Sequence, residues 1–303
     1  MRFAISIPQG VGDGEFDPET FRAHLRRAEA LGFESAWTQE STFGRSPSMA
    51  PNETLAYAAA CTERLRLGCA VYVTPLHSPI HLAKSISTLD QLSRGRLEVG
   101  IGTGGSSRMF SAFGVDGERF VGRFNEGLAL MKACWTEPSI EFDGRFWQVL
   151  GAAMEPKPFQ KPYPPLWFGG SHPAALRRAV RHGDGFFGAG SSTTAQFAEQ
   201  VRAVRQALDE AGRDPAGFAI AKRVYIAIDD DPEQARGRMD AALEHHYGRA
   251  GLVTVAVTGD ADQCVSGLRE VADGGAELIQ LNTLFDDGAQ MERLAAEVVP
   301  ALG

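Results

Sequence analysis

Residues 2–39 read RFAISIPQGVGDGEFDPETFRAHLRRAEALGFESAWTQ and contain one complete strand–helix–strand unit. The apolar run from Arg2 to Pro8 predicts a strand, and the amphipathic stretch from Pro18 to Leu31 predicts a helix that Asp17 caps. A second apolar run, Glu34 to Gln39, predicts the next strand. This order is typical of α/β proteins, in which helices cover a parallel sheet.

The same alternation continues almost to the end of the chain. Further strands are expected at Leu65 to Val73, Leu97 to Ile101, Leu166 to Phe168, Gly185 to Phe187, Ala219 to Ile228 and Glu277 to Leu281. Further helices are expected at Pro51 to Cys61, Pro79 to Leu92, Arg119 to Trp135, Ala174 to Arg181, Ala195 to Ala211, Pro232 to His246, Ala261 to Ala272 and Gly288 to Val299. An uninterrupted series of this kind favours a closed (β/α)8 TIM barrel over an open doubly wound sheet, and the chemistry of such a barrel lies beyond the strand C-termini.

An insertion interrupts the alternation after the fourth strand, between about residues 103 and 163. It includes an Asp143-Gly144 turn that predicts a hairpin between Ile140 and Val149. We expect the insertion to cover the mouth of the barrel. We also expect residues 1–303 to form a single domain, because no linker or internal repeat divides them.

The composition excludes several classes of protein. With 303 residues and 44% hydrophobic content, the chain can bury one large core. Its formal net charge of -8 gives no global attraction to nucleic acid or to an anionic membrane, so a small-molecule substrate is favoured. Met1 leads directly into the first strand without a basic or apolar leader, so we expect a cytoplasmic protein. Irregular spacing predicts buried thiols rather than a disulfide or metal framework at Cys61, Cys69, Cys134 and Cys264.

Motifs of metal-dependent and covalent hydrolysis are missing from the sequence. The 7 histidines include no HxH or HExxH arrangement, so no metal ligand is assigned. No GxSxG elbow occurs, and no cysteine stands beside an obvious histidine base. The sequence therefore favours neither a metal-dependent nor a covalent hydrolase.

Two glycine-rich turns follow predicted strands and could hold an anion. In the first, Gly102-Thr103-Gly104-Gly105-Ser106, glycine lets backbone N–H groups approach a cofactor phosphate closely. In the second, Phe168-Gly169-Gly170-Ser171, we expect Ser171 to cap a helix that begins near Pro173, so that the helix dipole faces the barrel mouth. Ordinary flexible or tight βα turns would also account for both segments.

Several short segments stand in a fixed order along the chain. They are Ala30-Leu31-Gly32-Phe33-Glu34-Ser35-Ala36-Trp37, Leu65-Arg66-Leu67-Gly68, Thr88-Leu89-Asp90-Gln91-Leu92-Ser93-Arg94-Gly95-Arg96, Gly100-Ile101-Gly102-Thr103-Gly104, Trp135-Thr136-Glu137-Pro138, Pro156-Lys157-Pro158, Pro164-Pro165-Leu166-Trp167-Phe168-Gly169-Gly170 and Gly183-Asp184-Gly185-Phe186. Together they resemble the luciferase-like monooxygenase superfamily, up to about residue 212. The resemblance implies a barrel that binds FMN or the deazaflavin coenzyme F420 at its mouth and transfers hydride or, with FMN, activates oxygen.

The resemblance also implies cofactor contacts in two strands. Ala70 and Val71 occupy the place where relatives often have a bulge or a non-prolyl cis peptide beneath the central ring, although a plain strand is equally compatible with the sequence. Gln39 lies in a segment that is similar to the deazaflavin-using branch, and we expect it to contact the cofactor.

Three residues are candidates for proton transfer. Glu40 matches an acidic position that a histidine follows in many deazaflavin-using relatives, but this chain has Ser41 there. The sugar-phosphate chemistry of those relatives is therefore not expected. His77, after the third strand, supplies an imidazole that could reach a substrate. We take Glu40, Ser41 and His77 as the catalytic candidates, with a surface or ion-paired role as the alternative for Glu40.

An acidic chain needs cationic side chains to hold an anionic cofactor. We expect Arg45, Arg108 and Arg223 in loops at the strand C-termini, and Arg223 among the cofactor contacts. Apolar surface for a tricyclic ring is expected from Tyr72, Met109, Phe110, Phe113 and Trp147, although core packing is favoured for the last two.

These observations support an oxidoreductase that transfers a hydride between coenzyme F420 and a small carbonyl, imine, activated alkene or alcohol. One alternative is a two-component monooxygenase that receives reduced FMN from a separate reductase. Another is a flavin-binding protein without catalytic activity. The resemblance further implies a homodimer, with a flavin or F420 reductase as an indirect partner.

Overall fold

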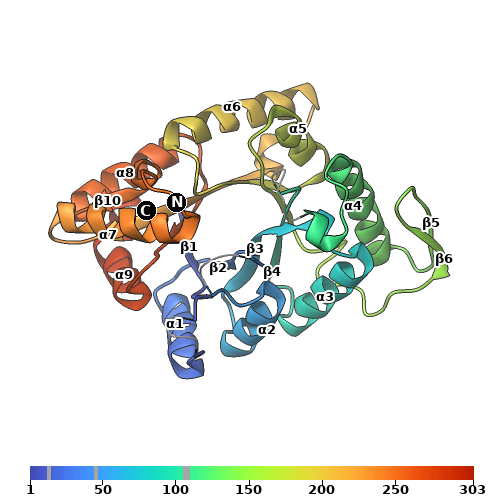
Figure 1. Cartoon of the computed structure of the whole chain (residues 1–303), viewed down its shortest axis with the longest axis horizontal. Coiled ribbons are helices and arrows are strands. Elements are labelled where there is room, and N and C mark those ends of the chain that lie inside the picture. Colours follow the sequence, from blue (N-terminus) through green and yellow to red (C-terminus); the bar gives the residue numbers. More distant parts are fainter. Residues whose placement is uncertain (12–14, 44–46, 105–109) are drawn as a thin grey trace.

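The computed structural model describes residues 1–11, 15–43, 47–104 and 110–303. Within these ranges, eight parallel strands close into a barrel (Figure 1), because β8 pairs with β9 at the ends of the series. The predicted (β/α)8 barrel is confirmed. In barrel order the strands are β1 (Arg2–Ser6), β2 (Ser35–Thr38), β3 (Arg66–Val73), β4 (Leu97–Gly102), β7 (Leu166–Phe168), β8 (Gly185–Gly188), β9 (Ala219–Ile228) and β11 (Leu278–Asn282).

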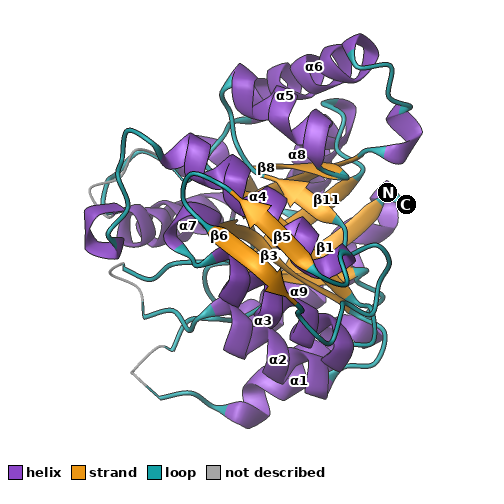
Figure 2. Ribbon diagram, turned by 90° about the vertical axis from the view of Figure 1, so that its right-hand side faces the viewer, coloured by secondary structure: helices purple, strands orange, loops and turns teal. Residues whose placement is uncertain are grey.

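Helices surround the outer side of the barrel, and the two chain ends lie side by side (Figures 1 and 2). Asp17 caps the first helix as predicted, since its side chain accepts a hydrogen bond from the backbone N–H of Glu19. The helices are α1 (Pro18–Ala30), α2 (Pro51–Cys61), α3 (Pro79–Leu92), α4 (Phe120–Thr136), α5 (Pro173–His182), α6 (Thr194–Glu210), α7 (Pro232–Tyr247), α8 (Ala261–Asp273) and α9 (Asp287–Arg293).

The inside of the barrel is filled by aromatic side chains from β2, β7 and β8. The rings of Trp37 and Trp167 lie 6.0 Å apart, and the ring of Phe187 lies 4.8 Å from the ring of Trp37. Glycines on adjacent strands make room for the indoles, since a Cβ at Gly68 or Gly185 would come within 2.5 Å of Trp37 or Trp167. This packed layer forms the floor on which the mouth of the barrel is built.

Strand β3 is irregular where it approaches β4. Its register shifts between Cys69 and Tyr72, and the peptide bond between Ala70 and Val71 is cis. The backbone comes so close to β4 that a Cβ at Gly100 would lie 2.2 Å from the carbonyl oxygen of Cys69. Only glycine fits at this position of β4 without a backbone shift.

The insertion packs a two-stranded hairpin on α4. Strands β5 (Ile140–Asp143) and β6 (Gln148–Ala152) pair around a four-residue connection, rather than around a tight Asp143-Gly144 turn. Glu126 of α4 holds this connection, because its carboxylate accepts backbone hydrogen bonds from Arg145, Phe146 and Trp147 at 2.7–3.0 Å. The connection is therefore held by a side chain of another element, whereas the prediction relied on the preference of the Asp143-Gly144 pair for tight turns.

Two further elements differ from the expected pattern. A short strand, β10 (Val257–Gly259), extends the pairing of β9 and was not predicted, because three residues give too little periodicity. The expected helix from Gly288 to Val299 is α9 followed by a π-helical turn, Leu294–Val298, and a 3₁₀ turn, Val299–Leu302. Pro300 accounts for the change near its end, since proline has no N–H to donate to an α-helix.

The cysteines and the hydropathy of the helices are two further features of the described ranges. Cys61, Cys69, Cys134 and Cys264 are buried free thiols, as predicted. No helix in these ranges combines the length and the apolar character needed to cross a membrane. 

We predict that Gly100→Ala lowers the free energy of unfolding by about 1–3 kcal/mol, because the new methyl group overlaps backbone atoms of β3. Urea denaturation monitored by circular dichroism measures the change. Gly237→Ala is the matched control: Gly237 lies inside α7 with open space around its Cα, so the protein should be unchanged or slightly stabilised. Equal midpoints for the two variants would contradict the proposed backbone contact.

Candidate functional site

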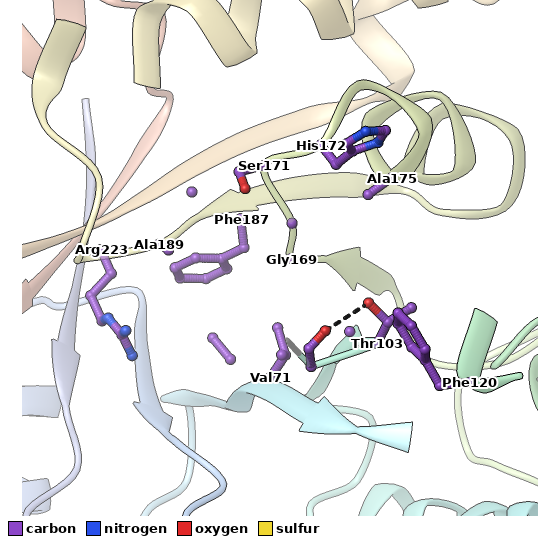
Figure 3. Close-up of a pocket in the computed structure, with 15 residues that line it drawn as sticks. Val71, Thr103, Phe120, Gly169, Ser171, His172, Ala175, Phe187, Ala189 and Arg223 are labelled. Carbon is purple, nitrogen blue, oxygen red and sulfur yellow. Dashed lines mark hydrogen bonds between the residues drawn. The ribbon is translucent and has the colours of Figure 1, made fainter. Parts of the chain in front are cut away.

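The C-terminal ends of β3, β4, β7 and β8 surround a cavity of about 570 Å³. Figure 3 shows Thr103 and Phe120 on one side, Arg223 on the opposite side, and Val71 and Phe187 between them. The cavity is lined by Ala70, Val71, Gly102, Thr103, Gly104, Phe120, Gly169, Gly170, Ser171, His172, Ala175, Phe187, Gly188, Ala189 and Arg223. A cavity of this volume, apolar at its centre and polar at its ends, has the dimensions of small-molecule and cofactor sites.

The side chain of Val71 forms part of the cavity floor and lies between Gly102 of β4 and Gly169, which follows β7. A Cβ at Gly102 would lie 2.8 Å from one Val71 methyl group, and a Cβ at Gly169 would lie 3.0 Å from the other. Gly104, with φ of 68°, adopts a backbone conformation that side chains disfavour. The glycines of both predicted turns therefore leave space for a strand residue and for a ligand above it.

The N-terminus of α5 opens into the cavity. His172, not Ser171, is its N-cap, because the His172 Nδ1 accepts the backbone N–H of Ala174 at 3.2 Å. Gly170, with φ of 150°, leads the chain into this position. Within the described part of the chain, the backbone N–H groups of Gly170, Ser171 and His172 have no hydrogen-bond acceptor. Such N–H groups at a helix N-terminus suit an anionic ligand.

Arg223 of β9 supplies a cation at the opposite side of the cavity. Its guanidinium has neither a hydrogen bond nor an ion pair with any described residue, and its Nε is buried. The guanidinium carbon lies 5.5 Å from the Tyr225 ring centroid, and Gly190 packs against Nε. A buried donor without an acceptor costs stability, so the position favours a ligand that accepts hydrogen bonds.

A second cavity of about 520 Å³ adjoins the first through Arg223. Its walls carry amides, hydroxyls, carboxylates and histidines from the C-terminal ends of β1 and β11, from the segments that follow β1, β2 and β11, and from α7. Among them are Gln9, Gln39, Glu40, Ser41, His245, His246, Tyr247, Asn282, Thr283 and Asp287. Burial, and then the positive charge of Arg223, lower the pKa of His246 below its ordinary value, which favours neutral imidazole there.

The structure brings two of the catalytic candidates into contact. Glu40 Oε1 lies 2.5 Å from His77 Nε2, and Glu40 Oε2 accepts the backbone N–H of Val73 at 2.5 Å. The Glu40 side chain is 8% exposed and faces the second cavity, whereas His77 lies behind it and is 28% exposed. The carboxylate of Glu40 is thus fixed in orientation, and its contact with the His77 imidazole leads away from the second cavity. Ser41 lies on the wall of the same cavity, and its hydroxyl donates to the Phe43 carbonyl at 3.4 Å.

Most other predicted contacts lie in one of the two cavities. Gln39 lines the second, where its amide donates to Asn282 Oδ1 at 3.1 Å. Phe168 lines neither cavity, because its ring packs against Phe124 with centroids 5.9 Å apart. Tyr72 is buried in the core and donates to Asn52 rather than covering the mouth. Gly105, Ser106, Arg45, Arg108 and Met109 lie outside the described residues.

The remaining aromatic candidates divide between the cavity wall and the core. Phe110 stacks on Phe120, which the sequence did not single out and which lines the first cavity. Phe113 pairs with Phe43, and Trp147 packs against the main core, so core packing is confirmed for Trp147. 

Lys222 was also not predicted as a site residue. It is buried on the outer side of β9, and its Nζ donates to the carbonyl oxygens of Ala189 and of Ser192, the latter at 2.9 Å. Burial, and then the nearby Arg223, lower the pKa of Lys222 to about 7. Lys222 therefore fixes the segment after β8, and that segment places Ala189 in the cavity wall. In the described ranges, no group of three or more histidine, cysteine or acidic residues could hold a metal ion.

The family model described as luciferase-like monooxygenase matches residues 1–278. An F420-dependent glucose-6-phosphate dehydrogenase of Intrasporangium calvum is 28% identical over 95% of this chain and 96% of its own length. An FMNH(2)-dependent dimethylsulfone monooxygenase of Pseudomonas putida is 30% identical over 78% of this chain and 68% of its own length. A phthiodiolone/phenolphthiodiolone dimycocerosates ketoreductase of Mycobacterium sp. is 29% identical over 61% of this chain, and the match spans about half of that relative, 49%.

Solved structures share the whole fold. The monooxygenase RslO1 from Streptomyces bottropensis superposes with a TM-score of 0.87 at 25% identity and covers 100% of both chains. An F420-dependent secondary alcohol dehydrogenase superposes with a TM-score of 0.86 at 18% identity, covering 100% of this chain and 99% of its own. The second similarity concerns the fold alone.

We predict that the buried amine of Lys222 makes stability depend on pH. In the unfolded chain the amine titrates near 10.5, whereas in the folded chain it titrates near 7, so the unfolded state binds more protons between these values. The free energy of unfolding contributed by this group should therefore fall as pH decreases from about 10.5 to about 7. Urea titrations of the wild-type protein and of Lys222→Met measure the difference. A difference between the two proteins that is constant across this range would show that Lys222 does not titrate there.

Proposed function

The chain belongs to the luciferase-like monooxygenase family, and we propose that it is an F420-dependent oxidoreductase that transfers a hydride to or from a small organic substrate. The substrate class is a carbonyl, imine or activated alkene in one direction and an alcohol in the other. The single observation that carries this proposal is the pair of adjoining cavities, which meet at Arg223.

The first cavity suits the cofactor. Ala70, Val71 and Phe187 offer an apolar surface for a flat ring system, and the aromatic floor of the barrel supports Phe187 from below. The unpaired N–H groups before α5 suit a phosphate or phosphodiester at one end of the cavity. Arg223, at the other end, would face polar atoms of the ring or of the substrate.

The second cavity suits the substrate because it is rich in hydrogen-bonding groups and contains Glu40. A bound deazaflavin supplies a hydride acceptor and donor. Oxidation of an alcohol releases a hydride from carbon and a proton from oxygen. Glu40 is oriented to take that proton, and His77, 2.5 Å away, can pass it outward. Carbonyl reduction uses the same groups in reverse. In this proposal His77 supplies the imidazole that many deazaflavin-using relatives carry immediately after the acidic residue, where this chain has Ser41.

The alternatives rest on weaker observations. The monooxygenase relative at 30% identity favours reduced FMN, whose phosphate the α5 N-terminus could equally bind. The proton relay of Glu40 and His77, however, fits substrate oxidation or reduction better than oxygen insertion. A flavin-binding protein without activity would not need the second, polar cavity.

The first test is cofactor binding. We predict that purified protein binds F420 more tightly than FMN, measured by quenching of cofactor fluorescence. Arg223→Gln should weaken F420 binding about 10- to 100-fold, because a charge-assisted contact is lost. Arg236→Gln removes an exposed cation of α7 and is the matched control, with unchanged affinity expected. Tight FMN binding together with turnover that stops without oxygen would favour the monooxygenase instead.

The second test concerns proton transfer. We predict that Glu40→Gln lowers kcat about 10²- to 10⁴-fold with little change in the F420 dissociation constant, because the amide cannot accept the proton. Glu199→Gln, on the exposed side of α6, is the control and should retain full activity. An unchanged kcat in this variant would remove Glu40 from the mechanism.

A further inference from the structure

A third cavity, of about 250 Å³, lies between α4 and α5 on the outer side of the barrel. Its lining is strongly cationic. Arg177, Arg178, Arg181 and His182 of α5 face it together with Ala174 and with Asn125 of α4. We call this cavity the α4–α5 groove.

The three arginines of the α4–α5 groove have no acidic partner. Across the described ranges, none of them forms an ion pair or a hydrogen bond, and no carboxylate lines the groove. Arg178 is half-buried over the ring of Phe124, 5.5 Å from its centroid, and burial lowers its pKa. Lys132 adds a further cation beside the groove, where it donates to the His182 carbonyl at 2.9 Å. So dense a cluster is unusual in a chain whose formal net charge is -8.

Helix stabilisation explains only part of the cluster. Cations in the last turn of a helix interact favourably with its dipole, which accounts for Arg181 and His182. Arg177 and Arg178 lie in the middle of α5, where the dipole has little effect. Each of them is, however, a neighbour of Arg181 on the helix surface, Arg177 at four residues and Arg178 at three. Like charges at these spacings repel one another, and an anionic ligand would relieve that repulsion.

The α4–α5 groove continues from the cofactor cavity along α5. His172 and Ala175 line the cofactor cavity, and Ala174 and Arg178 line the groove, so one helical turn belongs to both. On α4, Phe120 lines the first cavity and Asn125 lines the groove. The distance along α5 from Ala175 to Arg181 is about 9 Å, which an extended chain of two or three amino-acid units would span.

We propose that the α4–α5 groove binds the oligoglutamate tail of F420, which would leave the cofactor cavity at the α5 N-terminus and lie along Arg178, Arg177 and Arg181. This inference rests on the proposed function and makes it more specific. FMN ends in a phosphate and has no carboxylates to place in the groove. Two exposed arginines that each contribute a surface ion pair would together strengthen binding about tenfold.

The test compares F420 with one glutamate and F420 with five or more, with fluorescence quenching at low salt as the readout. The wild-type protein should bind the longer form about tenfold more tightly, with a steeper dependence on salt concentration. The double variant Arg177→Glu/Arg181→Glu should lose this preference and bind the one-glutamate form nearly as well as the wild-type protein does. Arg202→Glu/Arg236→Glu, which makes the same charge change at exposed positions of α6 and α7, should keep the preference.

Several outcomes would overturn the inference, and one of them also removes its premise. Equal affinities of the wild-type protein for both tail lengths, or equal losses in the two double variants, overturn the groove proposal alone. Failure of the wild-type protein to bind any form of F420 overturns the proposed function as well. Arg177→Gln/Arg181→Gln, a milder change, repeats the measurement if the charge reversal reduces the thermal midpoint.

Discussion

The close approach of β3 to its neighbours is the constraint on which the mouth of the barrel depends. The backbone at Cys69 lies too near Gly100 to allow a side chain there, and the methyl groups of Val71 fill the space that Gly102 and Gly169 leave open. Two glycines of β4, and Gly169 immediately after β7, are therefore needed by one irregular segment of β3. Gly102 and Gly169 also begin the turns that shape the cofactor cavity, so the same residues serve strand packing and leave space for a ligand.

The fold was largely predictable because its signals are local. Periodic apolar residues, helix caps and glycines at the ends of helices identified each barrel strand. An uninterrupted series of eight strands then favoured a closed barrel over an open sheet. The differences have separate causes. The hairpin connection is held by Glu126 of α4, a partner that the sequence of the hairpin does not reveal. At α5 the neighbouring residue His172 caps the helix in place of Ser171, a choice between two adjacent polar residues that the sequence leaves open.

The site was predictable in part. Both glycine turns and Arg223 could be found because each follows a strand end, and strand ends meet at the mouth. The contact of Glu40 with His77 was not foreseen, since the two residues are separated in sequence and meet only through the loop after β3. Lys222 was overlooked because alternation along β9 places it on the outer side of the barrel. There its hydrogen bonds to the carbonyl oxygens of Ala189 and Ser192 fix the segment that contributes Ala189 to the wall of the cofactor cavity.

Arg223 borders both cavities, and a charge shared in this way links their occupancy. A ligand in one cavity that accepts hydrogen bonds from the guanidinium reduces what Arg223 can offer to a ligand in the other. By thermodynamic reciprocity, each ligand then changes the affinity of the other by the same factor. Two anions would oppose each other, whereas a neutral substrate would leave the guanidinium to the cofactor. The position of one side chain thus makes the coupling between the two affinities depend on the charge of the substrate.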